Sequence, residues 1–214
     1  MRIINNKKKI DPLHPDPQVI KDAAAIIDRG GVVIIPTRCL YGLAVDALNA
    51  AAVQRVFALK KRALDNPLLV LIKSVDQLPG MAVNIPVHAC RIMERFWPGK
   101  VTLVFQAQND LPVELTAGTG KIGIRLPGHD ITRAVVRLTA NPITGTSANL
   151  SGKAGCSRVT DLDPAIAENA DLIIDAGPLK GGVGSTIVDV TCNPPIILRE
   201  GEVSAEDILT VAAS

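Results

Sequence analysis

Aromatic side chains are scarce in this sequence: its 214 residues include one Trp, one Tyr and three Phe. Proteins that bind single-stranded nucleic acid stack the bases on aromatic rings, so the composition argues against a surface of that kind. Nearly half of the residues, 47%, are hydrophobic, and the core must therefore be built from Val, Ile, Leu and Ala. Such a core is typical of α/β proteins with buried parallel strands.

Cysteine and histidine are also few and widely spaced. The four cysteines form no Cys-x-x-Cys pair, and His14, His88 and His129 lie far apart in the sequence. A structural zinc site needs several such ligands close together, so we expect no metal site made by the protein. Without a cysteine framework, the expected location is the reducing cytoplasm.

Long apolar runs are absent, and residues 1–10 are charged. A membrane-spanning helix needs about 20 apolar residues, and a secretory signal needs an apolar segment, so we expect neither. The formal net charge is only +2, which means that any nucleic-acid or nucleotide site must be a local patch. Lys7-Lys8-Lys9 could be such a patch, although a charge run near a chain end is more often simply solvated.

Apolar runs, turn residues and capping residues predict helices and strands that alternate early, with strands in quick succession in the last third. This order predicts a mixed sheet with a parallel part and an antiparallel edge. Asn49, Asp130 and Ser204 are expected to cap helices. We expect helices over residues 15–29, 50–59, 86–96, 131–139, 161–168 and from Ser204 onward. We expect strands over residues 32–35, 67–72, 101–105, 121–126, 171–175, 185–190 and 196–198.

The stretch 57–72 joins the end of a predicted helix to a predicted buried strand. Lys60, Lys61 and Arg62 fall where the helix should end, and the polar turn Asp65-Asn66-Pro67 follows. A guanidinium group can bond two phosphate oxygens at once, so cations on a rigid turn can hold an anion. Cations at a helix C-terminus also offset the helix dipole, and this simpler interpretation stays open.

Two further stretches contain candidate ligand-binding side chains. Residues 142–152 run from a short strand into a loop rich in small hydroxyl and amide groups, including Ser147 and Asn149. Such groups can bind phosphate or carboxylate oxygens, but they also form ordinary turns. Residues 37–43 leave the end of a predicted strand, where α/β sheets place ligands. The alternative for this segment is an ordinary connection with Tyr41 packed in the core.

Six motifs occur in one order along the chain: Pro36-Thr37-Arg38-Cys39-Leu40-Tyr41-Gly42-Leu43, Lys60-Lys61-Arg62 before Asn66-Pro67-Leu68, Ile122-Gly123-Ile124-Arg125-Leu126-Pro127, Ser147-Ala148-Asn149-Leu150-Ser151-Gly152, Ser185-Thr186-Ile187-Val188-Asp189 and Leu198-Arg199-Glu200-Gly201. Together they resemble the threonylcarbamoyl-AMP synthase family, which has the YrdC-like fold. The resemblance spans about residues 15–203. It implies an α/β YrdC-like single domain over residues 15–214, in the short form of the family, after an N-terminal extension of residues 1–14. It also implies a twisted mixed sheet flanked by helices, with an open cleft.

The resemblance further implies a nucleotidyltransferase that makes threonylcarbamoyl-AMP and pyrophosphate from L-threonine, bicarbonate and ATP. Mg²⁺ would bridge the ATP phosphates and keep most of its waters. The product would pass to a tRNA-modifying threonylcarbamoyl transferase complex, for the threonylcarbamoyladenosine modification of tRNA. Two alternatives stay open: a module that binds tRNA or double-stranded RNA without catalysis, and a carbamoyl-transfer relative with another acceptor.

Roles for individual residues follow from the same resemblance. Lys60 and Arg62 are implied to be catalytic by neutralising the ATP phosphates, and the ATP site would be completed by Asn66, Lys121, Asn149, Ser157 and Arg199. Threonine would be bound by Thr37, Cys39, Arg125, Ser147 and Ser185, with Arg125 on its carboxylate. In the family pattern, the first loop has an acidic residue followed by a second threonine, and a histidine often stands four residues after the proline of Asn-Pro-Leu. In this chain these three positions hold Arg38, Cys39 and Leu71. Because a site that lacks a hydrogen-bond partner discriminates less well, these departures bear most on the choice of amino acid.

Overall fold

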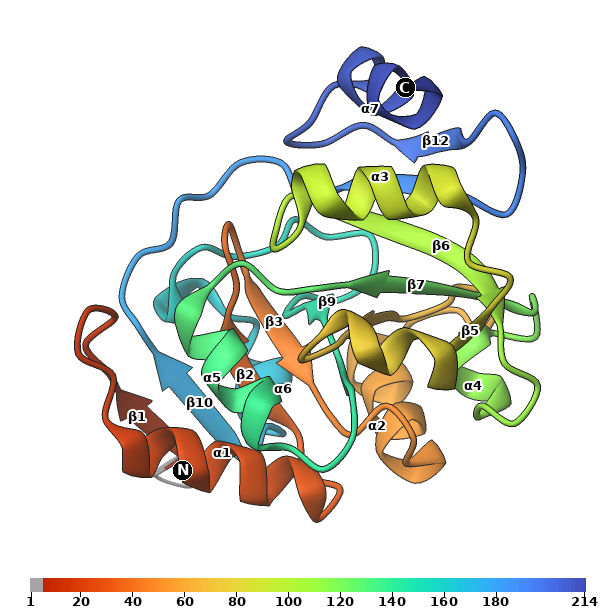
Figure 1. The fold of residues 1–214 in the computed structure, drawn as a ribbon. Coiled ribbons are helices and arrows are strands. Elements are labelled where there is room, and N and C mark those ends of the chain that lie inside the picture. The colour runs from red at the N-terminus through yellow and green to blue at the C-terminus, as the bar shows by residue number, and fades with distance from the viewer. Residues whose placement is uncertain (1–5) are drawn as a thin grey trace.

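The computed structural model describes residues 6–214, and within them the strands form two β-sheets. The first sheet has five strands in the order β1-β10-β2-β3-β9. Their bounds are Lys7–Lys9, Leu172–Asp175, Val33–Pro36, Tyr41–Ala44 and Thr146–Ser147. β1, β10 and β2 are parallel neighbours, whereas β3 is antiparallel to both β2 and β9. Figure 1 shows this sheet below the second one.

The second sheet has seven strands, six of them in the order β12-β11-β6-β7-β4-β8, with β5 paired to β6. β11 and β4 are parallel to β6 and β7 respectively, and the other pairs are antiparallel. The prediction of mixed pairing is therefore confirmed, although the strands are divided between two sheets. The bounds, from β12 to β5 in the order given, are Ile196–Arg199, Thr186–Asp189, Val101–Ala107, Lys121–Arg125, Leu69–Leu71, Ile143–Thr144 and Ala82–Val83.

A single segment, residues 143–147, contributes a strand to each sheet. It pairs with β4 as β8 and with β3 as β9, and Gly145 lies between the two. The Gly145 N–H donates to the Leu69 carbonyl oxygen at 2.8 Å. A Cβ atom at Gly145 would lie only 2.7 Å from the Leu71 side chain, so a glycine is needed for this close approach. The segment thus holds the two sheets together beside the loop that contains Ser147.

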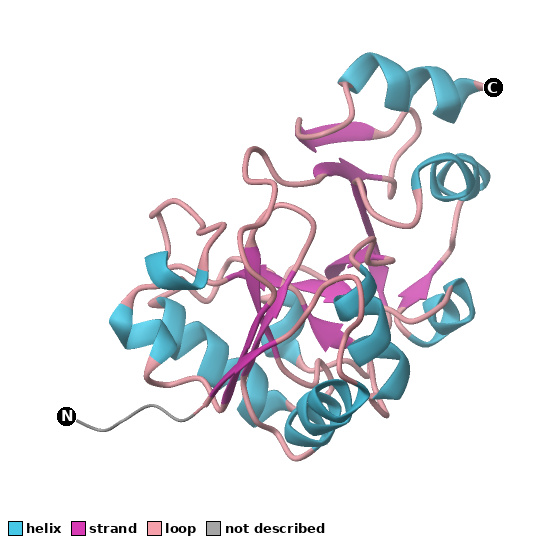
Figure 2. Ribbon diagram, turned by 90° about the vertical axis from the view of Figure 1, so that its left-hand side faces the viewer, coloured by secondary structure: helices cyan, strands magenta, loops and turns pink. Residues whose placement is uncertain are grey.

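The helices lie on both sides of the strands (Figure 2). The α-helices α1 to α7 span Pro17–Asp28, Ala50–Lys60, Val87–Phe96, Val113–Thr116, Asp130–Leu138, Pro164–Ala167 and Ala205–Ala213, and the 3₁₀ helices η1 and η2 span Val75–Gly80 and Val159–Asp161. Asn49 and Ser204 cap α2 and α7 through their side chains, as predicted. The cap predicted at Asp130 is wrong: Asp130 is the first residue of α5, because the backbone is already helical there, and His129 holds the cap position without a side-chain bond. None of the helices in residues 6–214 combines the length and apolar character that crossing a bilayer requires.

The core is aliphatic, as the composition predicts, and Tyr41 is its largest fully buried side chain. The Tyr41 hydroxyl donates to the Gly177 carbonyl oxygen at 2.7 Å and accepts from the Ala176 N–H at 3.1 Å. A buried hydroxyl needs such partners because an unpaired one costs about 1–3 kcal/mol. Tyr41 therefore ties β3 to the segment that follows β10.

Residues 7–9 are exposed, as a solvated charge run should be, but they also form β1 at the edge of the first sheet. Lys7 makes an ion pair of 2.9 Å with Asp175 at the end of β10. This part of the predicted N-terminal extension therefore belongs to the sheet. The domain boundary between residues 14 and 15 stays a prediction.

Candidate functional site

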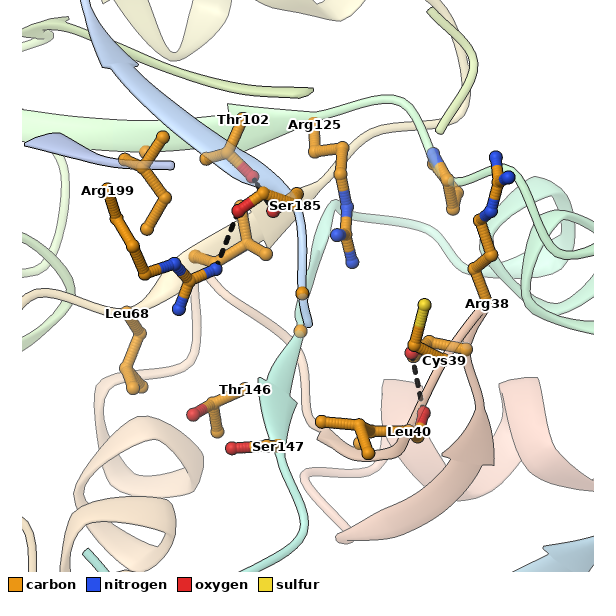
Figure 3. A pocket seen from close by; sticks show the side chains of 18 of the residues that line it. Arg38, Cys39, Leu40, Leu68, Thr102, Arg125, Thr146, Ser147, Ser185 and Arg199 are labelled. Carbon is orange, nitrogen blue, oxygen red and sulfur yellow. Dashed lines mark hydrogen bonds between the residues drawn. The ribbon is translucent and has the colours of Figure 1, made fainter. Parts of the chain in front are cut away.

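A cavity of about 600 Å³ is lined by residues of both sheets. Its floor is one face of the second sheet. Side chains alternate between the two faces of a strand, and Lys121, Gly123 and Arg125 of β7 accordingly lie on the cavity face, beside Thr102 and Val104 of β6. The walls come from the loop 37–40, the bend after α2, β9 and the segment that follows β12. Figure 3 shows the part of this cavity around Arg125, Ser185 and Cys39.

Nine of the twelve site residues predicted from the sequence line this cavity: Thr37, Cys39, Arg62, Asn66, Lys121, Arg125, Ser147, Ser185 and Arg199. They come from six separate stretches of the chain, which only folding brings together. The other three residues, Lys60, Asn149 and Ser157, do not line it.

Lys60 is buried behind the cavity wall, where it joins the two loops that the sequence singled out. As the last residue of α2 it is 1% exposed, and its Nζ atom donates to the carbonyl oxygens of Ser147 and, at 2.7 Å, Asn149. The N–H of Ser151 donates to the Lys60 carbonyl oxygen at 2.8 Å. Burial, together with the nearby Arg62 charge, lowers the pKa of Lys60 to about 8. Lys60 thus positions the 147–149 loop and does not face the cavity.

Arg62 reaches the cavity because the chain turns sharply at Lys61. Lys61 caps α2 in the left-handed conformation, with φ of 49°. The Arg62 guanidinium then donates from Nε to the Asn66 carbonyl oxygen and from Nη2 to the Pro67 carbonyl oxygen, both at 3.0 Å. Burial lowers the pKa of Arg62, but an arginine stays charged at neutral pH. The bend therefore presents a fixed cation on the cavity wall.

Arg125, the last residue of β7, is a half-buried cation on the cavity face of the second sheet. Its Nε atom is buried and makes no hydrogen bond among the described residues. Burial and the positive charge of Arg199 lower the pKa of Arg125 to about 10. In Figure 3 its guanidinium points into the cavity, toward the loop that carries Cys39. A half-buried cation with an unsatisfied buried N–H group favours an anionic ligand, because a negative charge would offset its desolvation.

Arg199, Ser185 and Thr102 form a hydrogen-bonded row across β12, the start of β11 and β6. Arg199 Nη2 donates to the Ser185 carbonyl oxygen at 2.7 Å, and the hydroxyls of Ser185 and Thr102 are 2.8 Å apart. Burial lowers the pKa of Arg199. Figure 3 shows the three side chains together on one side of the cavity. The row offers hydroxyl and guanidinium groups to a polar ligand.

The loop 37–40 forms the opposite wall. The Thr37 hydroxyl donates to the Leu40 carbonyl oxygen at 2.6 Å, which holds the loop in a tight turn. Arg38 makes an ion pair of 3.1 Å with Glu202. Burial, and after it the Glu202 charge, raises the pKa of the Cys39 thiol, so Cys39 presents a neutral, weakly hydrogen-bonding group. This wall therefore presents strongly polar groups at Thr37 and Arg38 and a weakly polar group at Cys39.

At another point of the cavity, Lys121 is already paired. Its Nζ atom lies 2.7 Å from Asp189 Oδ2, while Asp189 Oδ1 accepts from the N–H and hydroxyl of Thr191. Burial alone would raise the pKa of Asp189, but the bonds from Lys121 and Thr191 lower it. Because Asp189 already compensates the positive charge of Lys121, this lysine would attract a phosphate group only weakly.

Three further residues singled out in the sequence stabilise the fold and do not line the cavity: Asn149, Ser157 and Leu71. Asn149 Nδ2 donates to the carbonyl oxygens of Leu150 at 2.8 Å and Lys153 at 2.6 Å, which closes the loop after β9. Ser157 is half-buried, and its carbonyl oxygen accepts the Leu179 N–H at 2.8 Å. Leu71 is fully buried against Gly145, so its apolar side chain is not part of the cavity lining.

Several lining residues were not found from the sequence: Thr102, Thr132, His129, Thr146 and Glu202. Thr102 could have been found, since it shares a strand face with Val104 and a hydroxyl inside an apolar strand is unusual. Glu202 directly follows the last motif but pairs with a residue far away in the sequence, which no local pattern reveals. Within residues 6–214, no group of three or more His, Cys, Asp or Glu side chains is placed to hold a metal ion.

Comparison with known proteins agrees with this fold. The family model Sua5_yciO_yrdC, described as Telomere recombination, matches residues 25–201. The chain belongs to the Sua5/YciO/YrdC family, and the resemblance inferred from the six motifs is confirmed.

Two curated relatives are similar over almost all of this chain. The threonylcarbamoyl-AMP synthase of Pyrococcus abyssi is 37% identical over 206 residues, which cover 96% of this chain and 59% of that protein. The threonylcarbamoyl-AMP synthase of Bacillus subtilis is 38% identical over 201 residues, which cover 92% of this chain and 57% of that protein. The chain thus spans less than three fifths of the length of these two relatives.

A solved structure is similar as well. The crystal structure of P. abyssi Sua5 complexed with L-threonine has a TM-score of 0.89 and 36% sequence identity, covering 96% of this chain and 60% of that chain. Its likeness extends over both sheets, because nearly the whole of this chain is aligned.

Proposed function

We propose that this protein is a threonylcarbamoyl-AMP synthase. In the proposed reaction, the amine of L-threonine attacks bicarbonate and water leaves, which gives a carbamate. An oxygen of the carbamate then attacks the α-phosphorus of ATP, the bond to the pyrophosphate group breaks, and threonylcarbamoyl-AMP and pyrophosphate result. The proposal is supported by the two curated relatives of this name and by the relative whose structure contains L-threonine.

The observation that carries the proposal is that Arg62, Arg125 and Arg199, which lie far apart in the sequence, all line one cavity of about 600 Å³. Nucleotidyl transfer depends mainly on positioning and on neutralising phosphate charge. Arg62 and Arg199 would bind the phosphates, with Asn66 and Ser147 beside them. Arg125, whose buried Nε atom has no hydrogen-bond partner among the described residues, would bind the threonine carboxylate, with Thr37, Cys39 and Ser185 around the amino acid.

The buried lysine receives a different proposed role from the one that the motif implied. Lys60 would hold the 147–149 loop at the correct distance from Arg62, since it donates to carbonyl oxygens on that loop. Asn149 and Ser157 would support the nucleotide site through the backbone, and Lys121 would act only if a ligand separates it from Asp189. Mg²⁺ would be held by the phosphates and by water, because it prefers oxygen ligands and dehydrates reluctantly.

The wider setting is proposed on the same basis. Residues 15–214 would form the catalytic domain, acting in the cytoplasm, and the product would pass to a tRNA-modifying transferase complex. Binding of tRNA or double-stranded RNA is a separate hypothesis that rests on residues 7–9 and 60–62. Because Lys60 is buried and Lys7 is paired with Asp175, fewer cations are open to RNA than the sequence suggested. A steep loss of tRNA affinity with added salt would favour that hypothesis.

The proposed function is tested by exchange of labelled pyrophosphate into ATP, with Mg²⁺ present. We expect exchange that requires both L-threonine and bicarbonate, and that falls at least about 100-fold in Arg62→Ala, as loss of a preorganised charge contact does. The matched control is Lys61→Asn, which changes the neighbouring cation outside the cavity and suits its left-handed backbone. The proposal would be refuted if pyrophosphate exchange proceeded equally well without L-threonine, or if the Arg62→Ala variant were as active as wild type. Exchange with another amino acid instead would identify a relative with a different acceptor.

A further inference from the structure

Glu202 is one of two carboxylates that line the cavity within the described residues; the other is Asp189. Both oxygens of Asp189 are occupied, Oδ2 by Lys121 and Oδ1 by Thr191. Glu202 differs, because its two ion pairs, with Arg38 at 3.1 Å and Lys180 at 3.5 Å, both make their closest contact at Oε1. Among the described residues, the Cys39 thiol is the further hydrogen-bonding group beside this carboxylate. A thiol is only a weak donor, so Oε2 can still accept a hydrogen bond from a ligand.

The backbone around Glu202 is held firmly. Gly201 passes so close to β11 that a Cβ atom there would lie 2.3 Å from the Gly184 carbonyl oxygen. The Glu202 N–H donates to that same oxygen at 3.2 Å. On either side, the N–H groups of Gly201 and Val203 both donate to the Thr186 hydroxyl, at 3.0 and 3.1 Å. With its side chain only 11% exposed, the carboxylate has a fixed position in the cavity wall.

Positive charges surround this carboxylate. Arg38 and Lys180 contact it directly, and its negative charge acts on the pKa of Arg125 across the cavity. The Glu202 carboxylate favours the charged form of an amine beside it, whereas the cations Arg38, Lys180 and Arg125 oppose a further positive charge there. A neutral amine can donate an N–H to a carboxylate oxygen and keep its lone pair free for reaction.

We propose that Glu202 Oε2 accepts a hydrogen bond from the α-amino group of the amino-acid substrate. Arg125 and Glu202 would then fix the two ends of the amino-acid backbone, while Arg38 and Lys180 hold the carboxylate in place through Oε1. This inference rests on the proposed function, since it assigns a partner to the amine of threonine. It makes Glu202 a substrate-positioning residue that the six motifs do not include.

The test compares L-threonine with (R)-3-hydroxybutyrate, which is the same molecule without the amino group. Calorimetric titration of the full chain gives the ratio of the two dissociation constants. In Glu202→Met, a similarly shaped side chain without an acceptor, we expect this ratio to fall by about 10–100-fold, the range for a hydrogen bond to a charged group. Affinity for (R)-3-hydroxybutyrate should stay within about threefold, because that ligand makes no amine contact.

Glu200→Met is the matched control, since it removes an exposed carboxylate two residues away that does not line the cavity. We expect it to keep the wild-type ratio, whereas a purely structural role of Glu202 would weaken the binding of both ligands equally in Glu202→Met. A Glu202→Met variant with the wild-type ratio would overturn the inference alone. A wild-type protein that does not bind L-threonine would overturn the proposed function as well.

A second measurement needs no variant and covers the case in which Glu202→Met fails to fold. In a crystal structure of the full chain with L-threonine, the amine nitrogen should lie about 2.7–3.2 Å from Glu202 Oε2. A bound threonine with its amine more than about 4 Å from that oxygen would overturn the inference while leaving the proposed function in place.

Discussion

Lys60 Nζ donates a hydrogen bond to the carbonyl oxygen of Ser147, and this contact joins the end of α2 to the end of β9. The two residues lie in the two stretches that the sequence marked as candidate anion-binding loops. Their contact brings the Arg62 bend and the Ser147 loop to one cavity. It also explains why the lysine is buried, since its charge is compensated by carbonyl oxygens and not by a carboxylate.

The first prediction concerns the pH dependence of this contact. Because burial lowers the pKa of Lys60 from 10.5 to about 8, the folded protein binds its proton less tightly than the unfolded chain does. The penalty for a buried charge is fully present below pH 8 and is relieved as the pH rises from 8 to 10.5. Relative to Lys60→Met, wild type should therefore gain up to about 3 kcal/mol over this range. Urea unfolding of both proteins at pH 7, 8, 9 and 10 measures the difference, and a constant difference would contradict the prediction.

The second prediction concerns the close approach of Gly145 to Leu71. Gly145→Ala should lower the free energy of unfolding by about 1–3 kcal/mol, because its Cβ atom would meet a fully buried side chain at 2.7 Å. Gly80→Ala is the matched control, since nothing lies within 4 Å of its Cβ position. Leu71→Val should recover part of the loss in the double variant. Purely additive effects in this double-mutant cycle would show that the two residues do not interact.

The third prediction separates ligand binding from stability at Gly123. A Cβ atom at Gly123 would meet Thr102 and Val104 at ordinary contact distances of 3.5 and 3.9 Å, so Gly123→Val should fold. The valine side chain would occupy the cavity floor, and we expect ATP and threonine affinities to fall by about tenfold or more. Stability should stay equal or rise, since valine favours strands over glycine. Thermal unfolding and calorimetry together check this; unchanged affinity would mean that ligands bind elsewhere.

The fourth prediction concerns Asp189 and acid stability. The bonds from Lys121 and Thr191 outweigh burial and lower the pKa of Asp189. A carboxylate whose folded pKa is lowered stabilises the protein above its unfolded pKa, and this stabilisation is lost as the pH falls through the folded value. Wild type should therefore be more stable than Asp189→Asn at pH 6, and the difference should shrink below about pH 4. An equal difference at pH 6 and pH 3 would show that the charge does not matter.

Much of the local structure could be predicted from the sequence because its causes are local. The caps at Asn49 and Ser204 depend on residues within one turn of the helix. The aliphatic runs predicted the central strands within one or two residues. The cap at Asp130 failed because aspartate is also favoured in the first turn of a helix, so the residue type alone does not fix the starting position.

The site was harder to predict because its contacts are not local. Lys60 and Arg62 are two residues apart, yet the left-handed turn at Lys61 sends one behind the wall and the other into the cavity. The partners of Lys121 and Arg38, which are Asp189 and Glu202, lie far along the chain. The division into two sheets likewise depends on the packing between segments distant in sequence. A motif identifies which residues gather, but not which of them already have partners.

The central claim is that the bend after α2 and the loop after β9 together bind the triphosphate. A crystal structure of the full chain with a non-hydrolysable ATP analogue, Mg²⁺ and L-threonine tests it most directly. The account predicts phosphate oxygens within about 3 Å of the Arg62 guanidinium and of the Ser147 side chain or backbone N–H, with the threonine carboxylate on Arg125. Phosphates bound outside this cavity, or with Arg62 still turned only to the Asn66 and Pro67 carbonyl oxygens, would contradict it.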